Sequence, residues 1–168
     1  MEQEFPIKLV SILIDENFYE QDKDIMRYSN IILDMMEKCI DCFYCGFRVY
    51  VSSFVAIETM ENIVDIIMEK YRHIRFELIV PSKDVFDEPY WTNKLKKRYE
   101  RLSLSATSIE YLADKLCDVR ESDRDKALVK DADLVIFAGD DSDKVKNLFY
   151  YAYDNGASVL ALNMVDLI

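Results

Sequence analysis

Stretches of continuous apolar sequence alternate along the chain with longer segments whose apolar residues recur at helical spacing. The clearest apolar runs are 7–14 (IKLVSILI), 75–81 (RFELIVP), 133–139 (DLVIFAG) and 157–162 (ASVLAL). Such runs are typical of strands that are buried on both faces, as they are in a parallel sheet. An alternation of such strands with helices predicts parallel strands joined by right-handed crossovers. We therefore expect a three-layer α/β fold, a Rossmann-like, mostly parallel sheet with helices on both faces.

The remaining elements follow from the same patterns. Two further strands are expected at 42–53, with a bend at Gly46, and at 108–112. Gly156 is expected to take a left-handed conformation after the last helix. The chain of 168 residues is near the usual length of one domain, and it contains no repeat or linker, so 1–168 is expected to be a single domain. Helices are expected at 24–38, 57–71, 91–102, 122–130 and 143–155. Ser122 is expected to be the cap residue of the fourth of these helices.

The charge balance narrows the classes of partner. The net charge is −11, and an acidic surface repels both nucleic-acid phosphates and anionic lipid headgroups. No apolar run reaches the roughly 18 residues that a membrane span needs. The first six residues (MEQEFP) lack the basic start of a secretory signal. We expect a cytoplasmic protein with reduced cysteines and with no nucleic-acid or membrane partner.

Ligands of open parallel sheets bind beyond the carboxyl ends of the strands, where the strand order reverses. The residues that follow the predicted strands are therefore the candidates for a binding site. They are Ser52, Ser53, Asp15, Glu16, Gly139 and Asp140.

Each part of this set has a functional and a structural explanation. Ser52 and Ser53 precede a predicted helix, whose free N–H groups favour an anion, but a serine there is also a common helix cap. The carboxylates of Asp15, Glu16 and Asp140 would repel a bare phosphate, but they are compatible with a ribose or with a phosphate that carries Mg²⁺. They are also ordinary turn formers. No cofactor is expected other than Mg²⁺ accompanying a phosphate ligand.

From Val49 onward, over about two thirds of its length, the chain resembles the SLOG superfamily and within it the YpsA-like branch. The resemblance rests on 71–81 (YRHIRFELIVP), Trp91, 98–100 (RYE), Arg124-Asp125 through Val129, 131–136 (DADLVI), Tyr151-Ala152 and Gly156. It implies a Rossmann-like fold that binds nucleotides or nucleotide-derived signals. In some branches it also implies cleavage of an N-glycosidic bond.

The departures from that family concern the phosphate-binding loops. Asp15-Glu16-Asn17 stands where the family has a Thr-Gly-His-Arg-like turn, and Ser52-Ser53-Phe54 stands where it has a glycine-rich loop. Glycines let the backbone approach a pyrophosphate closely, and the whole chain has only three. The chain is therefore expected to be a divergent member that lacks the glycine-rich loop, and no catalytic residue carries over with it.

Two smaller sets of residues are candidates for catalysis or metal binding. Glu58 lies in the first turn of the helix that follows the serine pair. It is a weak candidate for orienting a ribose or for attacking an anomeric carbon. The alternative is that an acid in this position simply complements the helix dipole. Cys39, Cys42 and Cys45 have the C-x2-C-x2-C spacing of part of a metal-ligand set, to which Cys117 or the only histidine, His73, would add a fourth ligand. Core packing is the favoured explanation of these cysteines, and no metal is expected.

The segment 149–153 (FYYAY) places aromatic side chains around most of a helix. Some of them must be exposed or buried in a partner, so a homodimer through this helix is expected as readily as core packing.

Three functions follow in order of preference. The first is a binding module for a nucleotide or nucleotide-derived small molecule that acts as a sensor or regulator. The second is a protein-interaction scaffold on a decayed nucleotide-binding fold. The third is a hydrolase or transferase acting on a nucleoside N-glycosidic bond, and the missing glycines place it last.

Overall fold

The computed structural model describes residues 8–15, 25–51, 54–139 and 142–163. In this part of the chain six strands form one sheet in the order β4-β3-β2-β1-β5-β6, and every neighbouring pair is parallel. The strands are β1 (Leu9–Ile14), β2 (Gly46–Tyr50), β3 (Arg75–Ser82), β4 (Ser108–Ala113), β5 (Leu134–Gly139) and β6 (Ser158–Asn163). The helices are α1 (Ile25–Asp41), α2 (Phe54–Lys70), α3 (Asn93–Leu104), α4 (Glu121–Val129) and α5 (Lys146–Asp154), with short 3₁₀ turns η3 (Val85–Asp87), η4 (Leu116–Asp118) and η5 (Ser142–Val145).

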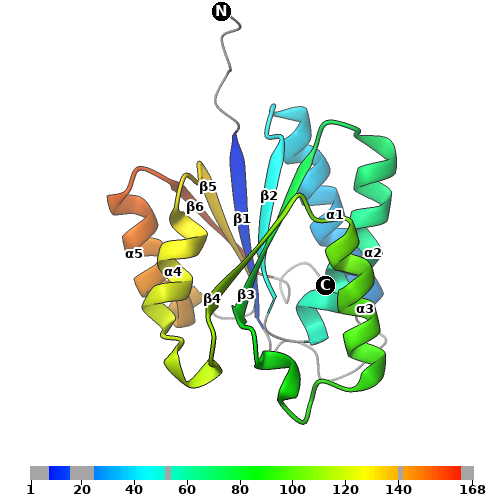
Figure 1. Ribbon diagram of the computed structural model, residues 1–168. Coiled ribbons are helices and arrows are strands. Elements are labelled where there is room, and N and C mark those ends of the chain that lie inside the picture. Colours follow the sequence, from blue (N-terminus) through cyan, green and yellow to red (C-terminus); the bar gives the residue numbers. More distant parts are fainter. Residues whose placement is uncertain (1–7, 16–24, 52–53, 140–141, 164–168) are drawn as a thin grey trace, which may run out of the picture.

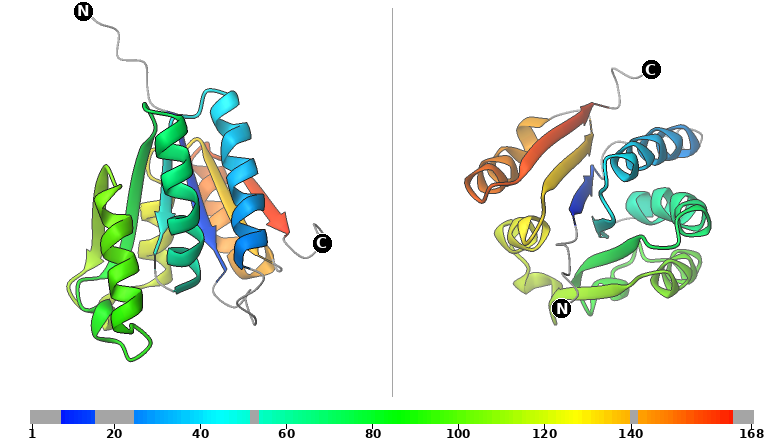
Figure 2. Two further views of the ribbon diagram at one scale, coloured as in Figure 1. Left: turned by 90° about the vertical axis from the view of Figure 1, so that its right-hand side faces the viewer. Right: turned by 90° about the horizontal axis from the view of Figure 1, so that it is seen from above.

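The helices cover both faces of this sheet, which confirms the predicted three-layer architecture. Helices α1, α2 and α3 lie on one face, and α4 and α5 lie on the other (Figure 1; the right-hand view of Figure 2 shows the three layers from above). Every residue of the central strand β1 is buried, as the continuous apolar run predicted. The larger of the two apolar cores lies beneath α1, α2 and α3, and the smaller lies beneath α4 and α5.

The second strand begins later than its composition predicted. Residues 42 and 43 form a turn, 44 and 45 are irregular, and β2 starts only at Gly46. The N–H of Phe43 donates to the Ile40 carbonyl and the N–H of Tyr44 to the Cys39 carbonyl, each at 3.0 Å. These two bonds are the Schellman motif that ends a helix, and it requires a left-handed residue, here Phe43 with φ 70°. Aromatic composition indicated strand at 42–45, but the hydrogen bonds that end α1 determine its conformation.

Two other boundaries differ in detail from the pattern. Ser122 was expected to cap α4, but the cap residue is Arg120, whose backbone N–H donates to the Asp123 carboxylate at 3.0 Å. The predicted helix 143–155 is divided into η5 and α5. The expectation for Gly156 is confirmed, since it takes φ +81° directly after α5.

Helix α4 is fixed to the sheet by a buried arginine. Arg48 on β2 donates from Nη1 to the carbonyls of Ala127 (2.9 Å) and Lys130 (2.5 Å) at the end of α4, and its Nε pairs with Glu77 of β3 at 3.0 Å. The hydroxyl of Ser11 on β1 donates to a further carbonyl of this turn, that of Leu128. The last carbonyls of a helix have no partner within it, so these donors complete the C-terminus of α4 where it meets the sheet.

No helix in the described ranges has the length and apolar character required to cross a membrane.

Arg48→Met is expected to lower the free energy of unfolding by about 3 kcal/mol, because it leaves Glu77 without its cation and removes the Arg48 donor from the carbonyls of Ala127 and Lys130. Urea denaturation followed by circular dichroism measures this loss. Arg75→Met, at the exposed start of β3, is the matched control and should stay within about 0.5 kcal/mol of the wild type. Equal stability of the two variants would contradict the role of Arg48.

Candidate functional site

A cleft of about 400 Å³ opens at the carboxyl ends of the strands. The sheet order reverses between β1 and β5, since β2, β3 and β4 extend to one side of β1 and β5 and β6 to the other. The cleft includes Ile14 at the end of β1 and Phe137 near the end of β5, so it lies at the switch point where such sheets bind ligands. Its volume is within the range of small-molecule sites.

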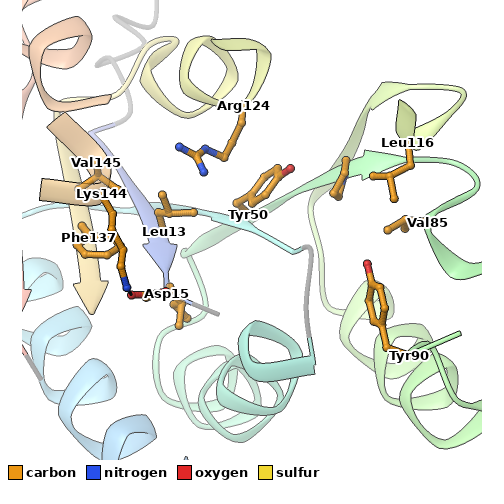
Figure 3. A pocket seen from close by; sticks show the side chains of 12 residues that line it. Leu13, Asp15, Tyr50, Val85, Tyr90, Leu116, Arg124, Phe137, Lys144 and Val145 are labelled. Carbon is orange, nitrogen blue, oxygen red and sulfur yellow. Dashed lines mark hydrogen bonds and ion pairs between the residues drawn. The ribbon is translucent and has the colours of Figure 1, made fainter. Parts of the chain in front are cut away.

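The cleft has a polar end and an apolar end (Figure 3). Asp15 and Lys144 form the polar end, next to the switch point, and Tyr50 and Arg124 lie between the two ends. The apolar end is formed by side chains of the segments that follow β3 and β4, namely Val85, Tyr90 and Leu116.

An ion pair closes the polar end. The Nζ of Lys144 lies 3.1 Å from the Oδ2 of Asp15, whose side chain is nearly buried. The backbone N–H of Asp15 donates to the Ala138 carbonyl at 2.9 Å, so the residue after β1 is bound to β5 by its backbone and to η5 by its side chain. A carboxylate that is held in this way directs Lys144 along the rim of the cleft (Figure 3).

Gly139 is required by the close approach of these two strand ends. A Cβ at this position would lie 2.5 Å from the Cζ of Phe137 and 2.8 Å from the Cβ of Asp15. Both distances are below any normal contact, so a larger residue would displace Asp15 and with it the pair that Asp15 forms with Lys144. The glycine that ends β5 therefore serves the packing of the site.

Arg124 extends from α4 into the cleft, beside Leu13 and Tyr50 (Figure 3). Its Nε and Nη2 donate to the Oδ1 of Asp125 at 3.1 and 2.9 Å, and Glu121 lies 3.7 Å from Nη2. Among the described residues its Nη1 has no hydrogen-bond partner. The guanidinium is thus oriented by its own helix and keeps two N–H donors for a group in the cleft.

Asp125 is the buried half of this pair. Burial raises the pKa of its carboxyl above the ordinary value, and the Arg124 guanidinium beside it opposes that rise. An aspartate in this position keeps Arg124 extended, because the ion pair is lost if the arginine turns away from the cleft.

The residues predicted from strand ends divide into two groups. Asp15 lines the cleft, and Gly139 packs against Asp15 without itself lining the cleft; ligand binding by either residue stays a prediction. Ser52, Ser53, Glu16 and Asp140 lie outside the described residues. Whether any of them binds a ligand stays a prediction.

Glu58 does not line the cleft. It lies in a separate hollow between the starts of α2 and α3, where its Oε1 is 2.7 Å from the Nη1 of Arg98. Glu61, one turn further along α2, pairs with Arg101 at 3.0 Å. The acids of α2 therefore hold the basic residues of α3, and the catalytic role considered for Glu58 stays a prediction.

The cysteines are free thiols at different depths: Cys39 and Cys45 are half-buried, while Cys42 and Cys117 are exposed. Burial raises the pKa of the Cys39 thiol. His73 is exposed in the turn before β3, at the amino ends of the strands, whereas the cleft lies at their carboxyl ends. Within the described ranges, no group of three or more His, Cys, Asp or Glu side chains is arranged to hold a metal ion.

Three residues that line the cleft were not predicted from the sequence. Lys144 lies in η5, beyond the residues that directly follow β5. Arg124 lies on a helix and Tyr90 in a loop, so no strand-end rule points to either. The resemblance did include Arg124-Asp125, although without a role for them.

No protein-family model matches this chain, and no curated protein matches it. The resemblance to the SLOG superfamily therefore stays a prediction.

The buried Asp125 should give stability a specific pH dependence. Because its pKa is higher in the folded protein than in the unfolded chain, ionisation costs folding free energy, and this cost develops as the pH rises above about 4. In Asp125→Asn the cost is absent, so the stability of the variant relative to wild type should increase with pH over this window.

Urea denaturation between pH 3.5 and 7 measures the difference. Asp118→Asn, on the exposed surface of η4, is the control for replacing a solvated carboxyl. If Asp125→Asn instead loses stability relative to wild type as the pH rises, the attraction of Arg124 outweighs burial and the stated sign is wrong.

Proposed function

We propose that this chain binds a nucleotide or nucleotide-derived small molecule in the cleft at the switch point and acts as a sensor or regulator. The observation that carries the proposal is Arg124, whose guanidinium lines the cleft and is oriented by the buried Asp125 carboxylate through Nε and Nη2. Guanidinium groups bind phosphates through paired N–H donors, and a fixed orientation lowers the entropy lost on binding.

The rest of the cleft suits the other parts of such a ligand. Tyr50 and Tyr90 provide aromatic rings for stacking, and Val85 and Leu116 provide apolar contact for a base. Lys144, which neutralises Asp15, places a second cationic group at the rim, where a phosphate would otherwise meet an acidic protein surface. A role for Mg²⁺ is expected only together with a phosphate ligand.

Binding without catalysis is the form of this function that the residues favour. The glycine-rich loop of the resembled family is missing from the sequence. Glu58, the weak catalytic candidate, is engaged by Arg98 outside the cleft. A hydrolase or transferase acting on an N-glycosidic bond therefore remains the less favoured alternative.

The proposal predicts a ligand-dependent shift in thermal stability. A ligand at 100 times its dissociation constant adds about 2.7 kcal/mol to the unfolding free energy. We expect at least one of AMP, ADP-ribose, diadenosine diphosphate or a cyclic dinucleotide, with or without Mg²⁺, to give this shift. Arg124→Gln should weaken its binding about ten- to a hundredfold in calorimetry, because charged hydrogen bonds to phosphate are lost.

The matched control is Lys126→Gln, which removes one positive charge from the exposed side of the same helix. It should leave the dissociation constant within about twofold, since a solvated charge outside the cleft is largely screened. If both variants weakened ligand binding equally, the loss would come from the change in net charge and not from the position of Arg124 in the cleft. No shift with any compound would favour the scaffold function.

A homodimer through α5 is proposed as well, because this helix presents large aromatic side chains to solvent. Tyr150 and Tyr153 are 68% and 75% exposed, whereas Phe149 packs partly against the core beneath α5. The exposed apolar residues Val159 and Leu160 lie on the neighbouring edge strand β6. Apolar surface of this kind is typical of protein interfaces.

The doubly substituted Tyr150→Ser/Tyr153→Ser variant is expected to shift the protein from dimer to monomer in sedimentation equilibrium. Lys146→Ser, at the start of the same helix, should leave the dimer intact. A wild-type protein that is monomeric even at the highest concentration the centrifuge can measure would refute this interface.

A further inference from the structure

A second hollow, of about 200 Å³, lies next to the cleft between the starts of α2 and α3. Tyr90 lines both spaces, with its ring partly exposed. The two spaces are therefore neighbours that share one aromatic wall.

The lining of the hollow suits one planar ring. Phe54, the first residue of α2, and Tyr90 both contribute aromatic side chains that are more than a third exposed. Leu95 of α3 adds apolar surface. Aromatic rings bind nucleobases by stacking, and each stacked base adds substantially to the binding affinity, whichever base it is.

The polar groups of the hollow suit a base attached to an anionic linker. The Glu58 carboxylate is held by Arg98 at 2.7 Å and retains acceptor positions for an amino group. Lys94 contributes a positive charge to the lining. Arg124 contributes one to the cleft, so a negatively charged linker between the two spaces would have a cation at either end.

We propose that the hollow is a ring subsite and that the ligand belongs to the dinucleotide class. One ring system occupies the hollow between Phe54 and Tyr90, the other part lies in the cleft, and a pyrophosphate-like linker passes Tyr90. This inference rests on the proposed function, since it assigns the ligand of the cleft a second ring.

The test compares diadenosine diphosphate with ADP-ribose by isothermal titration calorimetry. The two compounds share one adenosine, the pyrophosphate and the second ribose, and they differ in the second adenine. Diadenosine diphosphate is expected to bind at least tenfold more tightly, from the stacking of that adenine. Phe54→Ser should remove this advantage and leave the affinity for ADP-ribose within about twofold.

The matched control is Ile66→Ser, which removes an exposed apolar side chain from the same helix away from the hollow. It should preserve the preference for the two-ring compound, and circular dichroism checks that both variants fold. Trp91 provides a second readout, because its ring centroid is 6.5 Å from that of Tyr90 and it is the only tryptophan in the chain. Its fluorescence should respond to diadenosine diphosphate in the wild type, and this response should be lost in Phe54→Ser.

The outcomes separate the two proposals. If ADP-ribose binds in an Arg124-dependent manner and diadenosine diphosphate binds no more tightly, the ring subsite is refuted and the function of the cleft stands. The same holds if Phe54→Ser weakens both compounds equally. If neither compound binds, nor any other nucleotide, the function of the cleft is refuted and the subsite with it.

Discussion

The attachment of α4 to the sheet is the contact on which the candidate site depends. This helix has nine residues, and its buried side chains are only Asp125, Leu128 and Val129. So short a helix is unstable by itself and needs tertiary contacts. Arg48 and Ser11 provide them by donating to the carbonyls of its last turn. Arg124 is carried on this helix, so a buried cation in the sheet fixes the position of a second cation in the cleft.

The two faces of the sheet are stabilised by different means. On one face, α1 and α2 bury long apolar stripes, including Ile32, Ile57 and Met60, and the hydrophobic effect dominates. On the other face, polar contacts contribute a larger share, through Arg48 and the pair of Arg124 with Asp125. A buried polar contact fixes geometry more narrowly than apolar packing does, because its angles and distances are restricted. The polar face is also the one that contributes Arg124 to the cleft.

Most of the fold was predictable because strands buried on both faces need continuous apolar sequence. Residues that break this pattern for tertiary reasons were not predictable. Ser11 and Arg48 lie in buried strands, and the Ser11 hydroxyl and the Arg48 Nη1 find their acceptors in a helix about 80 to 120 residues later in the sequence. For the site, the strand-end rule located Asp15, which lines the cleft, and Gly139, which packs against Asp15, whereas Arg124 reaches the same cleft from a helix and was missed. Its contribution depends on the packing of α4, which local sequence does not encode.

The two exposed thiols, Cys42 and Cys117, lie at opposite ends of the strands. Cys117 is in η4, directly after the cleft residue Leu116, whereas Cys42 is in the turn that follows α1, at the amino edge. A maleimide dye on Cys117 would experience any change in the polarity of the neighbouring cleft, and the same dye on Cys42 would not. The native chain thus contains both a reporter position and an internal reference, and occupancy could be followed by fluorophore emission without introducing a new cysteine.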